Sequence, residues 1–382
     1  MNKLSPAEVH ASALVIDTHA DTPQRFVDEG WDFTGPLGTG MLNLETARRG
    51  NLAAEFFAIW AEPVEWKGRF AERTQSLIDA MLAQVSKHPQ AMRLGVSPDD
   101  IETAHRDGIF CALMGIEGGH SIENSIDRLR DFYRQGVRYM TLTWSNSNEW
   151  ADSSGDDTDP TVPHHGGLSD FGRDVVREMN RLGMMVDVSH VADSTFWDVL
   201  RTTRTPILAS HSNARALTPV KRNLTDEMLR AIAANNGVVM VNFYSGFVDA
   251  AWRETWEGSR TERQKEHRVM EEELHAEGRP VLYGDTLQLD RKHAARQPRA
   301  RFKCLIDHFD HIAQIAGIDH VGIGTDFDGM AHLPEGIDSA ADLPKITEAL
   351  MARGYTAEQM HKVLGGNLLR VFRDIEAARS CD

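Results

Sequence analysis

Eight short, mostly apolar segments are spaced along the chain, and helical patterns lie between them. The segments are residues 14–19, 55–60, 110–116, 138–143, 184–189, 206–211, 238–243 and 320–325. Apolar runs of this length are typical of strands that are buried on both faces of a parallel sheet. Apolar residues recur at helical spacing between them, most clearly over 168–182 ahead of Gly183 and from Thr225 onward. Only the first connection lacks a clear long helix.

Eight strands that alternate with helices predict a parallel sheet, and eight such units favour closure into an α/β barrel of the (β/α)8 TIM type. An open, doubly wound sheet is the alternative. No Gly-x-Gly-x-x-Gly motif follows the first segment, which argues against a dinucleotide-binding fold. We expect one barrel domain over 1–382, with a polar, charged insertion at 245–300 after the seventh strand. Such an insertion would decorate the loop face of the barrel as a lid or a partner contact.

The composition excludes several classes of function. The 382 residues include 41 Lys and Arg against 57 Asp and Glu, a net charge of −16, which opposes binding to nucleic acid. Three cysteines are too few and too scattered for a disulfide framework or a cysteine-based zinc site. No stretch approaches the ~20 apolar residues of a membrane span, and the first residues lack the apolar core of a signal peptide. We therefore expect a soluble, cytoplasmic protein that contacts no membrane.

Side chains able to bind metal follow several predicted strands at their carboxyl ends, where barrel active sites assemble. His19 and Asp21 follow the first strand two residues apart, so on an extended segment they point the same way and can chelate one cation. A hydrogen-bonded pair is the alternative. Glu117 follows the third strand, where a carboxylate is costly to bury unless it is paired or metal-bound. It could instead cap the next helix or pair with an arginine.

Two histidines occupy equivalent places on successive strands. His190 ends the fifth strand and His211 the sixth, each after a serine. Neighbouring strands lie ~4.8 Å apart, so these imidazoles could share one ion, although a single histidine of this kind is more often a satisfied core residue. Asp326 follows the eighth strand and would face the same mouth, as a ligand or a general base. Asp328 fits an Asp-Gly turn or a helix cap better.

These side chains predict a metal centre on one rim of the barrel. Nitrogen and oxygen ligands without thiolate favour Zn²⁺, with Mn²⁺, Co²⁺ or Ni²⁺ as alternatives. Two cations require one carboxylate to bridge them, and two metals ~3.5–4 Å apart can hold a hydroxide and polarise a carbonyl or phosphoryl oxygen. The residues alone therefore predict metal-dependent hydrolysis without naming a substrate.

Longer motifs resemble those of the membrane (renal-type) dipeptidases, a branch of the amidohydrolase superfamily. Within residues 12–375 the matching segments are VIDTHADTP, GIEGGHSIE, RYMTLT, GLSDFGRDVVREMNRLGMMVDVSH, ASHSNARAL, KRNLTDEMLR, GVVMVNFY and HVGIGTDFDG. The resemblance implies a (β/α)8 barrel with two zinc ions that hydrolyses dipeptides by metal-activated hydroxide and tolerates a D-residue on the C-terminal side. It also implies a homodimer, since the family often forms dimers.

The resemblance implies roles for the metal-binding residues. His19 and Asp21 match the ligands of one metal, and Glu117 matches the bridging carboxylate. His190 and His211 match the ligands of the second metal.

The resemblance also implies how the substrate is held and cleaved. Asp326 matches the residue that carries a proton from metal-bound water to the departing amine, so Asp326 and Glu117 are the expected catalytic residues. Arg222 matches the arginine that holds the terminal carboxylate, a role that suits a planar guanidinium. Tyr244, at the end of the GVVMVNFY segment, is expected to contact the substrate.

Trp144 departs from the family pattern. Well-known members carry a histidine at this position, just after the fourth strand, that assists binding of the substrate or transition state. Tryptophan can stack and donate one hydrogen bond, but it cannot titrate or carry charge. Another reaction on the same metal site, on an N-acyl amino acid, lactone or phosphotriester, is therefore the alternative. A non-catalytic barrel is a third hypothesis, which predicts no bound metal or no turnover.

Overall fold

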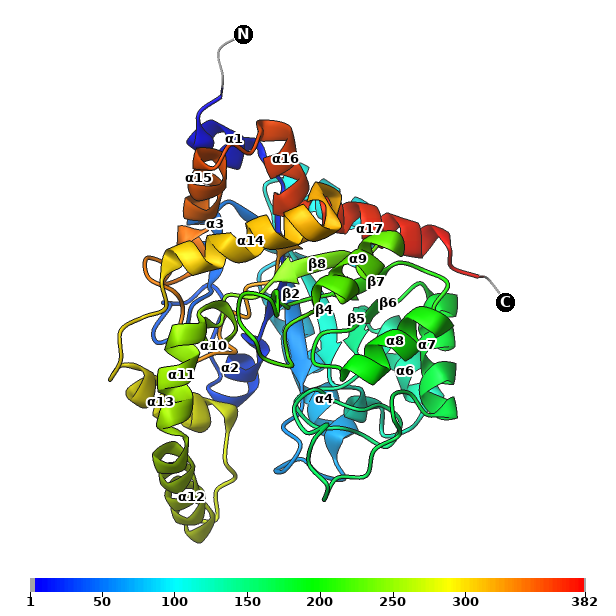
Figure 1. Ribbon diagram of the computed structural model, residues 1–382, viewed down its shortest axis with the longest axis vertical. Coiled ribbons are helices and arrows are strands. Elements are labelled where there is room, and N and C mark those ends of the chain that lie inside the picture. The colour runs from blue at the N-terminus through cyan, green and yellow to red at the C-terminus, as the bar shows by residue number, and fades with distance from the viewer. Residues whose placement is uncertain (1–3, 381–382) are drawn as a thin grey trace.

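The computed structural model describes residues 4–380, and a closed ring of eight parallel strands forms its centre (Figure 1). The ring strands are β1 (Val15–Ala20), β2 (Leu52–Trp60), β4 (Phe110–Glu117), β5 (Val137–Thr141), β6 (Met185–Asp187), β7 (Ile207–Ala209), β8 (Val238–Val241) and β9 (Val321–Ile323). Each expected segment overlaps one of these strands. The predicted (β/α)8 barrel is therefore confirmed, and the alternative of an open, doubly wound sheet is wrong.

The ring closes between β2 and β4, which are not consecutive in the chain. They pair in continuous register from Ala54 opposite Cys111 to Trp60 opposite Glu117. The intervening strand β3 (Met92–Leu94) lies outside the ring and pairs only with the first residues of β4. The sequence pattern does not predict β3, because only one of its three residues is buried.

Helices surround the ring and connect its strands. They are α1 (Pro6–Ser12), α2 (Pro23–Asp28), α3 (Leu44–Arg49), α4 (Phe70–Lys87), α5 (Pro98–Arg106), α6 (Ile126–Arg134), α7 (Asp170–Leu182), α8 (Asp193–Thr202), α9 (Asp226–Ala234), α14 (Phe302–Ala316), α15 (Pro344–Ala352), α16 (Ala357–His361) and α17 (Asn367–Ala377). The predicted caps are present: Gly183 ends α7 at φ 77°, and the Thr225 side chain accepts a hydrogen bond from the first turn of α9. The first connection holds only the short helices α2 and α3.

Two apolar layers hold the barrel together. The interior is filled by side chains such as Phe56, Tyr139 and Met240, which share one cluster with Phe372 of α17. A larger cluster packs the outer faces of the strands against the helices. Because the interior is filled, the carboxyl-end rim is left to carry the polar residues. Within residues 4–380 no helix combines the length and the apolar character that crossing a membrane requires.

Four helices occupy the 245–300 segment: α10 (Ser245–Val248), α11 (Ala250–Gly258), α12 (Arg260–Ala276) and α13 (Tyr283–Ala294). In Figure 1, α12 extends away from the barrel at the lower left, and α13 lies between it and the strands. Only Arg263 of α12 is buried. Charged pairs such as His267 with Asp290 and Arg296 with Glu262 join α12 to the chain beyond it. Contacts between charged side chains therefore account for much of the polar character of the segment.

Candidate metal centre and substrate cavity

Glu117, the last residue of β4, lies at the centre of the predicted ligand set. Its Oε1 is 3.0 Å from Nε2 of His190 and 3.4 Å from Nε2 of His211. Its Oε2 is 3.5 Å from Nε2 of His19, and that nitrogen is 3.6 Å from Oδ2 of Asp21. The structure thus brings together five side chains from the ends of β1, β4, β6 and β7.

The imidazoles crowd one another as well. Nε2 of His190 is 2.9 Å from Nε2 of His211, and the rings of His211 and His19 stack with centroids 3.8 Å apart. Asp326 joins the same group, because its carboxylate lies within 4.8 Å of ligand atoms of His19 and Asp21. Lone pairs that converge in this way, buried from water, are stabilised by a cation between them.

The electrostatics of the centre favour positive charge. Burial lowers the pKa of His19, but Tyr139 and Glu117 outweigh it and raise that pKa well above its ordinary value. Burial opposes ionisation of Glu117, yet His19 and the other imidazoles hold its pKa well below the usual range. Burial and the charge of Arg222 lower the pKa of His190 to about 4, so this imidazole is neutral and able to ligate. Nε2 of His19 is buried without a hydrogen-bond partner. These nitrogen and oxygen donors fit divalent cations such as zinc.

Hydrogen bonds behind His211 fix which of its nitrogens faces the centre. Nδ1 of His211 is 2.7 Å from Oγ of Ser210, and that hydroxyl donates to Oδ2 of the buried Asp187 at 2.6 Å. Because the Ser210 proton is used on Asp187, Nδ1 of His211 must carry a proton and donate it to Ser210. Nε2 of His211 is then unprotonated, and its lone pair is available to bind a metal.

Tyr139 of β5 supports His19 in the same manner. Its hydroxyl is 2.9 Å from Nδ1 of His19 and donates to the carbonyl oxygen of Thr18 at 3.1 Å. The ring crosses the barrel interior over Gly115, where a Cβ atom would lie 2.0 Å from Cζ of Tyr139. Only glycine at 115 therefore leaves room for the tyrosine to reach β1 and hold Nε2 of His19 toward the centre.

Two of the site residues have an unusual backbone. His190 and Asp326 both have φ 67°, in the left-handed region that non-glycine residues seldom adopt. Each such residue costs ~1–3 kcal/mol, and such conformations persist where the surrounding structure imposes them. They turn the chain sharply after β6 and β9, so that both side chains face the metal centre instead of continuing along the strands.

Asp326 has the properties of a proton carrier. Burial raises the pKa of Asp326 to about 8, the carboxylates of Asp21 and Glu117 add to this effect, and His19 opposes it. Oδ2 of Asp326 accepts a hydrogen bond of 2.8 Å from Nδ2 of Asn242, which fixes the orientation of the carboxyl group. A group with a pKa near neutrality can both accept and donate a proton at little cost.

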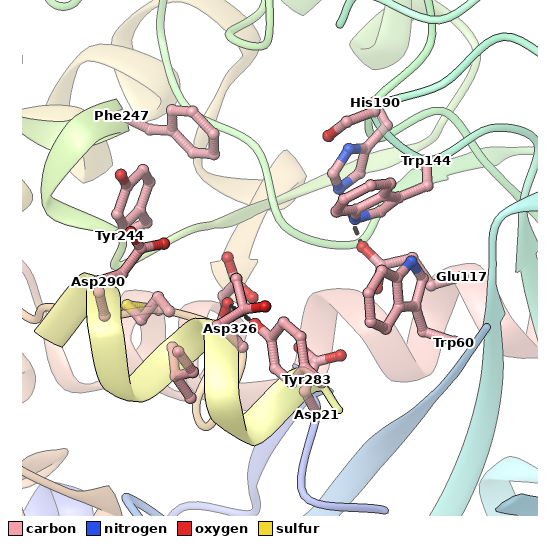
Figure 2. Close-up of a pocket in the computed structure, with 16 residues that line it drawn as sticks. Asp21, Trp60, Glu117, Trp144, His190, Tyr244, Phe247, Tyr283, Asp290 and Asp326 are labelled. Carbon is pink, nitrogen blue, oxygen red and sulfur yellow. Dashed lines mark hydrogen bonds and ion pairs between the residues drawn. The ribbon is translucent and has the colours of Figure 1, made fainter. Parts of the chain in front are cut away.

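A cavity of about 740 Å³, partly open to solvent, lies over the metal centre. Figure 2 shows its two sides and its floor. One side carries Trp60, Glu117, Trp144 and His190, the other carries Tyr244, Phe247 and Asp290, and Asp21, Tyr283 and Asp326 lie between them. Aromatic walls with a few convergent polar groups are typical of small-molecule sites.

The predicted substrate residues are placed differently from one another. Trp144 and Tyr244 line the cavity directly, and the Trp144 ring centroid is 4.9 Å from that of Trp60. Arg222 lines an adjoining cavity that shares Phe247 with the first, and its guanidinium lies 5.4 Å from the Phe247 ring. Its two terminal nitrogens donate to Oγ of Ser212 and to the carbonyl oxygen of His211, while Nε is buried without a partner.

Several residues of the site are absent from the sequence prediction. Tyr139 and Asn242 contact site residues from within or just after strands, and the asparagine could have been found as a polar side chain that directly follows an apolar strand. Tyr283 and Asp290 come from α13, and nothing in the polar pattern of 245–300 indicates that this helix reaches the barrel mouth.

A further group of described residues that could hold a cation lies away from the barrel. Glu262 and Glu266 of α12 face His293 of α13. Their carboxylates are already paired, because Arg296 lies 2.8 Å from Glu262 and Lys292 lies 3.3 Å from Glu266. The charges of this group balance without a metal ion.

Known proteins share both the sequence pattern and the fold. The sequence profile of the membrane dipeptidase family, peptidase family M19, matches residues 5–381. Dipeptidase 3 of Mus musculus is 32% identical over 341 residues, which are 89% of this chain but 59% of that protein, so the chain spans less than two thirds of this relative. The probable dipeptidase PvdM from Pseudomonas aeruginosa has a TM-score of 0.83 at 25% identity over 98% of both chains.

A second solved structure is a metallopeptidase from Rhodobacter sphaeroides bound to a phosphinate mimic of the dipeptide L-Ala-D-Ala. It has a TM-score of 0.75 at 25% identity, and the alignment covers 95% of this chain and 99% of that one. These matches confirm the resemblance that the motifs indicate. Since the family profile spans nearly the whole sequence, the chain belongs to the membrane dipeptidase family, peptidase family M19.

Proposed function

We propose that this protein is a metallo-dipeptidase that binds two zinc ions and hydrolyses dipeptides, including those with a D-residue on the C-terminal side. The observation that carries the proposal is the convergence of three imidazole nitrogens on the Glu117 carboxylate, at 3.0 to 3.5 Å. Membership of the family supports the reaction class. The L-Ala-D-Ala mimic bound to the Rhodobacter sphaeroides relative supports the tolerance for a D-residue.

In this proposal the ligands divide into two sets that share one carboxylate. His19 and Asp21 would hold the first ion, His190 and His211 would hold the second, and the carboxylate of Glu117 would contribute to both sets. When bound, two such ions supply a water molecule of lowered pKa and polarise the scissile carbonyl. Manganese, cobalt or nickel could occupy the same nitrogen and oxygen donors.

Asp326 moves the proton in the proposed reaction. It accepts a proton from the attacking water and returns it to the leaving amine, a role that its position beside the ligand atoms of His19 and Asp21 supports. Asn242 holds the carboxyl group in place through one oxygen, which leaves the other free for the reacting atoms.

Three residues position the substrate. Arg222 binds the C-terminal carboxylate, and its unpartnered Nε is one donor available for that contact. Trp144 and Tyr244 flank the cavity and contact the two side chains of the dipeptide. Because the arginine requires a free carboxylate near the metals, only very short peptides would be cleaved.

The proposal is tested with a panel of L,L- and L,D-dipeptides, assayed on protein whose zinc content has been measured. We expect turnover of dipeptides that exceeds turnover of N-acyl amino acids, lactones and phosphotriesters. The Asp326→Asn variant should retain its metal and lose a factor of about 10² in kcat. The Asp310→Asn variant is a suitable control, since Asp310 is bound by Arg353 on the outer surface.

The rival hypotheses make different predictions in the same experiment. Preferred turnover of N-acyl amino acids, lactones or phosphotriesters would replace the dipeptidase proposal, and Trp144 is the residue that favours this outcome. Purified protein that binds no zinc would indicate a non-catalytic barrel. Full activity of Asp326→Asn would contradict the role assigned to that carboxyl group.

A further inference from the structure

The wall of the cavity opposite Trp144 is built by α13, a helix of the 245–300 segment. Tyr283, Thr286, Leu287 and Asp290 lie on successive turns of this helix and line the cavity. Figure 2 shows Asp290 on this helix beside Tyr244, across the cavity from His190 and Glu117. The metal centre and the wall that faces it therefore come from separate parts of the chain.

Asp290 differs from the other carboxylates that line the cavity. Asp21, Glu117 and Asp326 all lie at the metal centre, whereas Asp290 lies at the opposite end. Among the described residues that line the cavity there is no lysine or arginine. Within residues 4–380 the charge of Asp290 is balanced from behind by His267 of α12, and not by a residue of the cavity wall.

The contacts of Asp290 leave one of its oxygens free. Nε2 of His267, from α12, lies 2.9 Å from Oδ1 and orients the carboxylate. Oδ2 accepts no hydrogen bond from any residue in 4–380, and 28% of the side chain is exposed. Burial raises the pKa of Tyr244, the charge of Arg253 lowers it and the charge of Asp290 raises it, so this carboxylate acts on a side chain that lines the cavity.

Two basic residues of α12 bear on Asp290. The hydrogen bond with Asp290 raises the pKa of His267, so this imidazole is a counter-charge at Oδ1. Arg263 of α12 donates to the carbonyl oxygen of Trp256 and to Oγ of Ser259, and it stacks on the Trp256 ring at 3.6 Å. It forms no ion pair with Asp290 within 4 Å among the described residues. The carboxylate is thus oriented, partly desolvated and available to a cation in the cavity.

We propose that Asp290 recognises a primary ammonium group of the substrate through Oδ2. The inference rests on the proposed dipeptidase function, in which Arg222 holds the carboxylate of the same molecule. An anion site and a cation site at separate places select a zwitterion and fix its direction across the metal centre. The ammonium belongs either to the N-terminal residue or to a basic side chain, and the two sources are separable by experiment.

The experiment compares kcat/KM ratios in the wild-type enzyme and in Asp290→Asn, which keeps an oxygen for His267. Three matched pairs are used: Ala-Lys against Ala-norleucine, Lys-Ala against norleucine-Ala, and Ala-Ala against lactoyl-alanine, in which a hydroxyl replaces the ammonium. We expect Asp290→Asn to reduce one of the three ratios by about tenfold, and the affected pair identifies the source of the ammonium. Three unchanged ratios would overturn the inference.

Controls separate this inference from the proposed function. Asp285→Asn alters a carboxylate of the same helix that is bound by Arg279 and lines a different cavity, so it should leave all three ratios unchanged. Asp290→Glu restores the charge and should restore part of the lost ratio. If the zinc-loaded wild-type protein cleaves no dipeptide, the proposed function fails. The dissociation constants of the same pairs, measured by calorimetry, then decide whether Asp290 binds an ammonium group.

Discussion

Replacing Tyr139 by phenylalanine removes one oxygen atom from the support of a predicted zinc ligand. The hydroxyl is fully buried and lies 2.9 Å from Nδ1 of His19, while it donates to the carbonyl oxygen of Thr18. With Nε2 of His19 on a metal, Nδ1 must carry a proton, and that proton has the tyrosine oxygen as its acceptor. The phenylalanine ring fills the same space over Gly115, so the packing is preserved.

The size of the effect follows from what the substitution leaves behind. A buried N–H donor without an acceptor costs about 1–3 kcal/mol. Since about 1.4 kcal/mol is a factor of ten in a binding constant, the zinc dissociation constant of the His19 site should rise about 10- to 100-fold. The affinity of the second site, which His190 and His211 form, should change less.

The assay is a zinc titration against a competing chelator, followed by activity measurements at saturating zinc. We expect weaker binding at one site and near-complete recovery of turnover in excess metal. Tyr133→Phe is the control, because the Tyr133 hydroxyl makes no hydrogen bond within residues 4–380 while its ring packs on Arg138 at 4.2 Å. Unchanged zinc affinities, or a loss of turnover that excess zinc does not restore, would refute the reasoning.

Three further perturbations test the proposed site. Arg222→Lys keeps the charge but loses the bidentate fork, so KM for dipeptides should rise about tenfold with little change in kcat; an unchanged KM would remove Arg222 from substrate binding. Trp144→Ala removes a ring that packs near Trp60 at 4.9 Å, and it should raise KM about fivefold for aromatic dipeptides relative to Ala-Ala. An equal effect on both substrates would contradict a stacking role. Removal of zinc by a chelator should abolish hydrolysis. It should also lower the free energy of unfolding by about 2.7 kcal/mol for each site, or about 5.4 kcal/mol for the two proposed sites, relative to protein in metal at 100 times its dissociation constant. An unchanged unfolding midpoint in calorimetry would argue against the metal sites.

The barrel could be predicted because eight short apolar runs alternate with helical patterns, which is typical of strands that are buried on both faces of a parallel sheet. The lengths of β6, β7 and β9 could not be predicted, because each strand has three residues where six are expected. Two of the three missing residues of each strand lie at its carboxyl end, where the candidate site is. His190 at φ 67° leaves the extended conformation, and the ladder ends before it. Hydropathy alone does not distinguish a residue that continues a strand from one that turns out of it.

The rim residues could be predicted because the carboxyl ends of all the ring strands meet at one edge. The residues that support the rim residues through hydrogen bonds, and those that face them across the cavity, could not be predicted. In the sequence Tyr139 cannot be distinguished from the other residues of an apolar strand. Its contact with His19 could not be predicted because the two positions are 120 residues apart. Asp290 lies in a helix without a marked apolar stripe, so only the position of α13 over the barrel mouth reveals it.

The separate origins of the two walls have a consequence for how this protein can be altered. The ring strands are tied to one another by register, so a change in any ligand disturbs its neighbours. Helix α13 contacts the barrel through the hydrogen bonds of Tyr283 to Gly329 and of Arg291 to Thr39, among others, and it carries none of the proposed metal ligands. Under the proposed function, changes in α13 would alter the wall that faces the substrate without replacing a residue that is expected to bind metal.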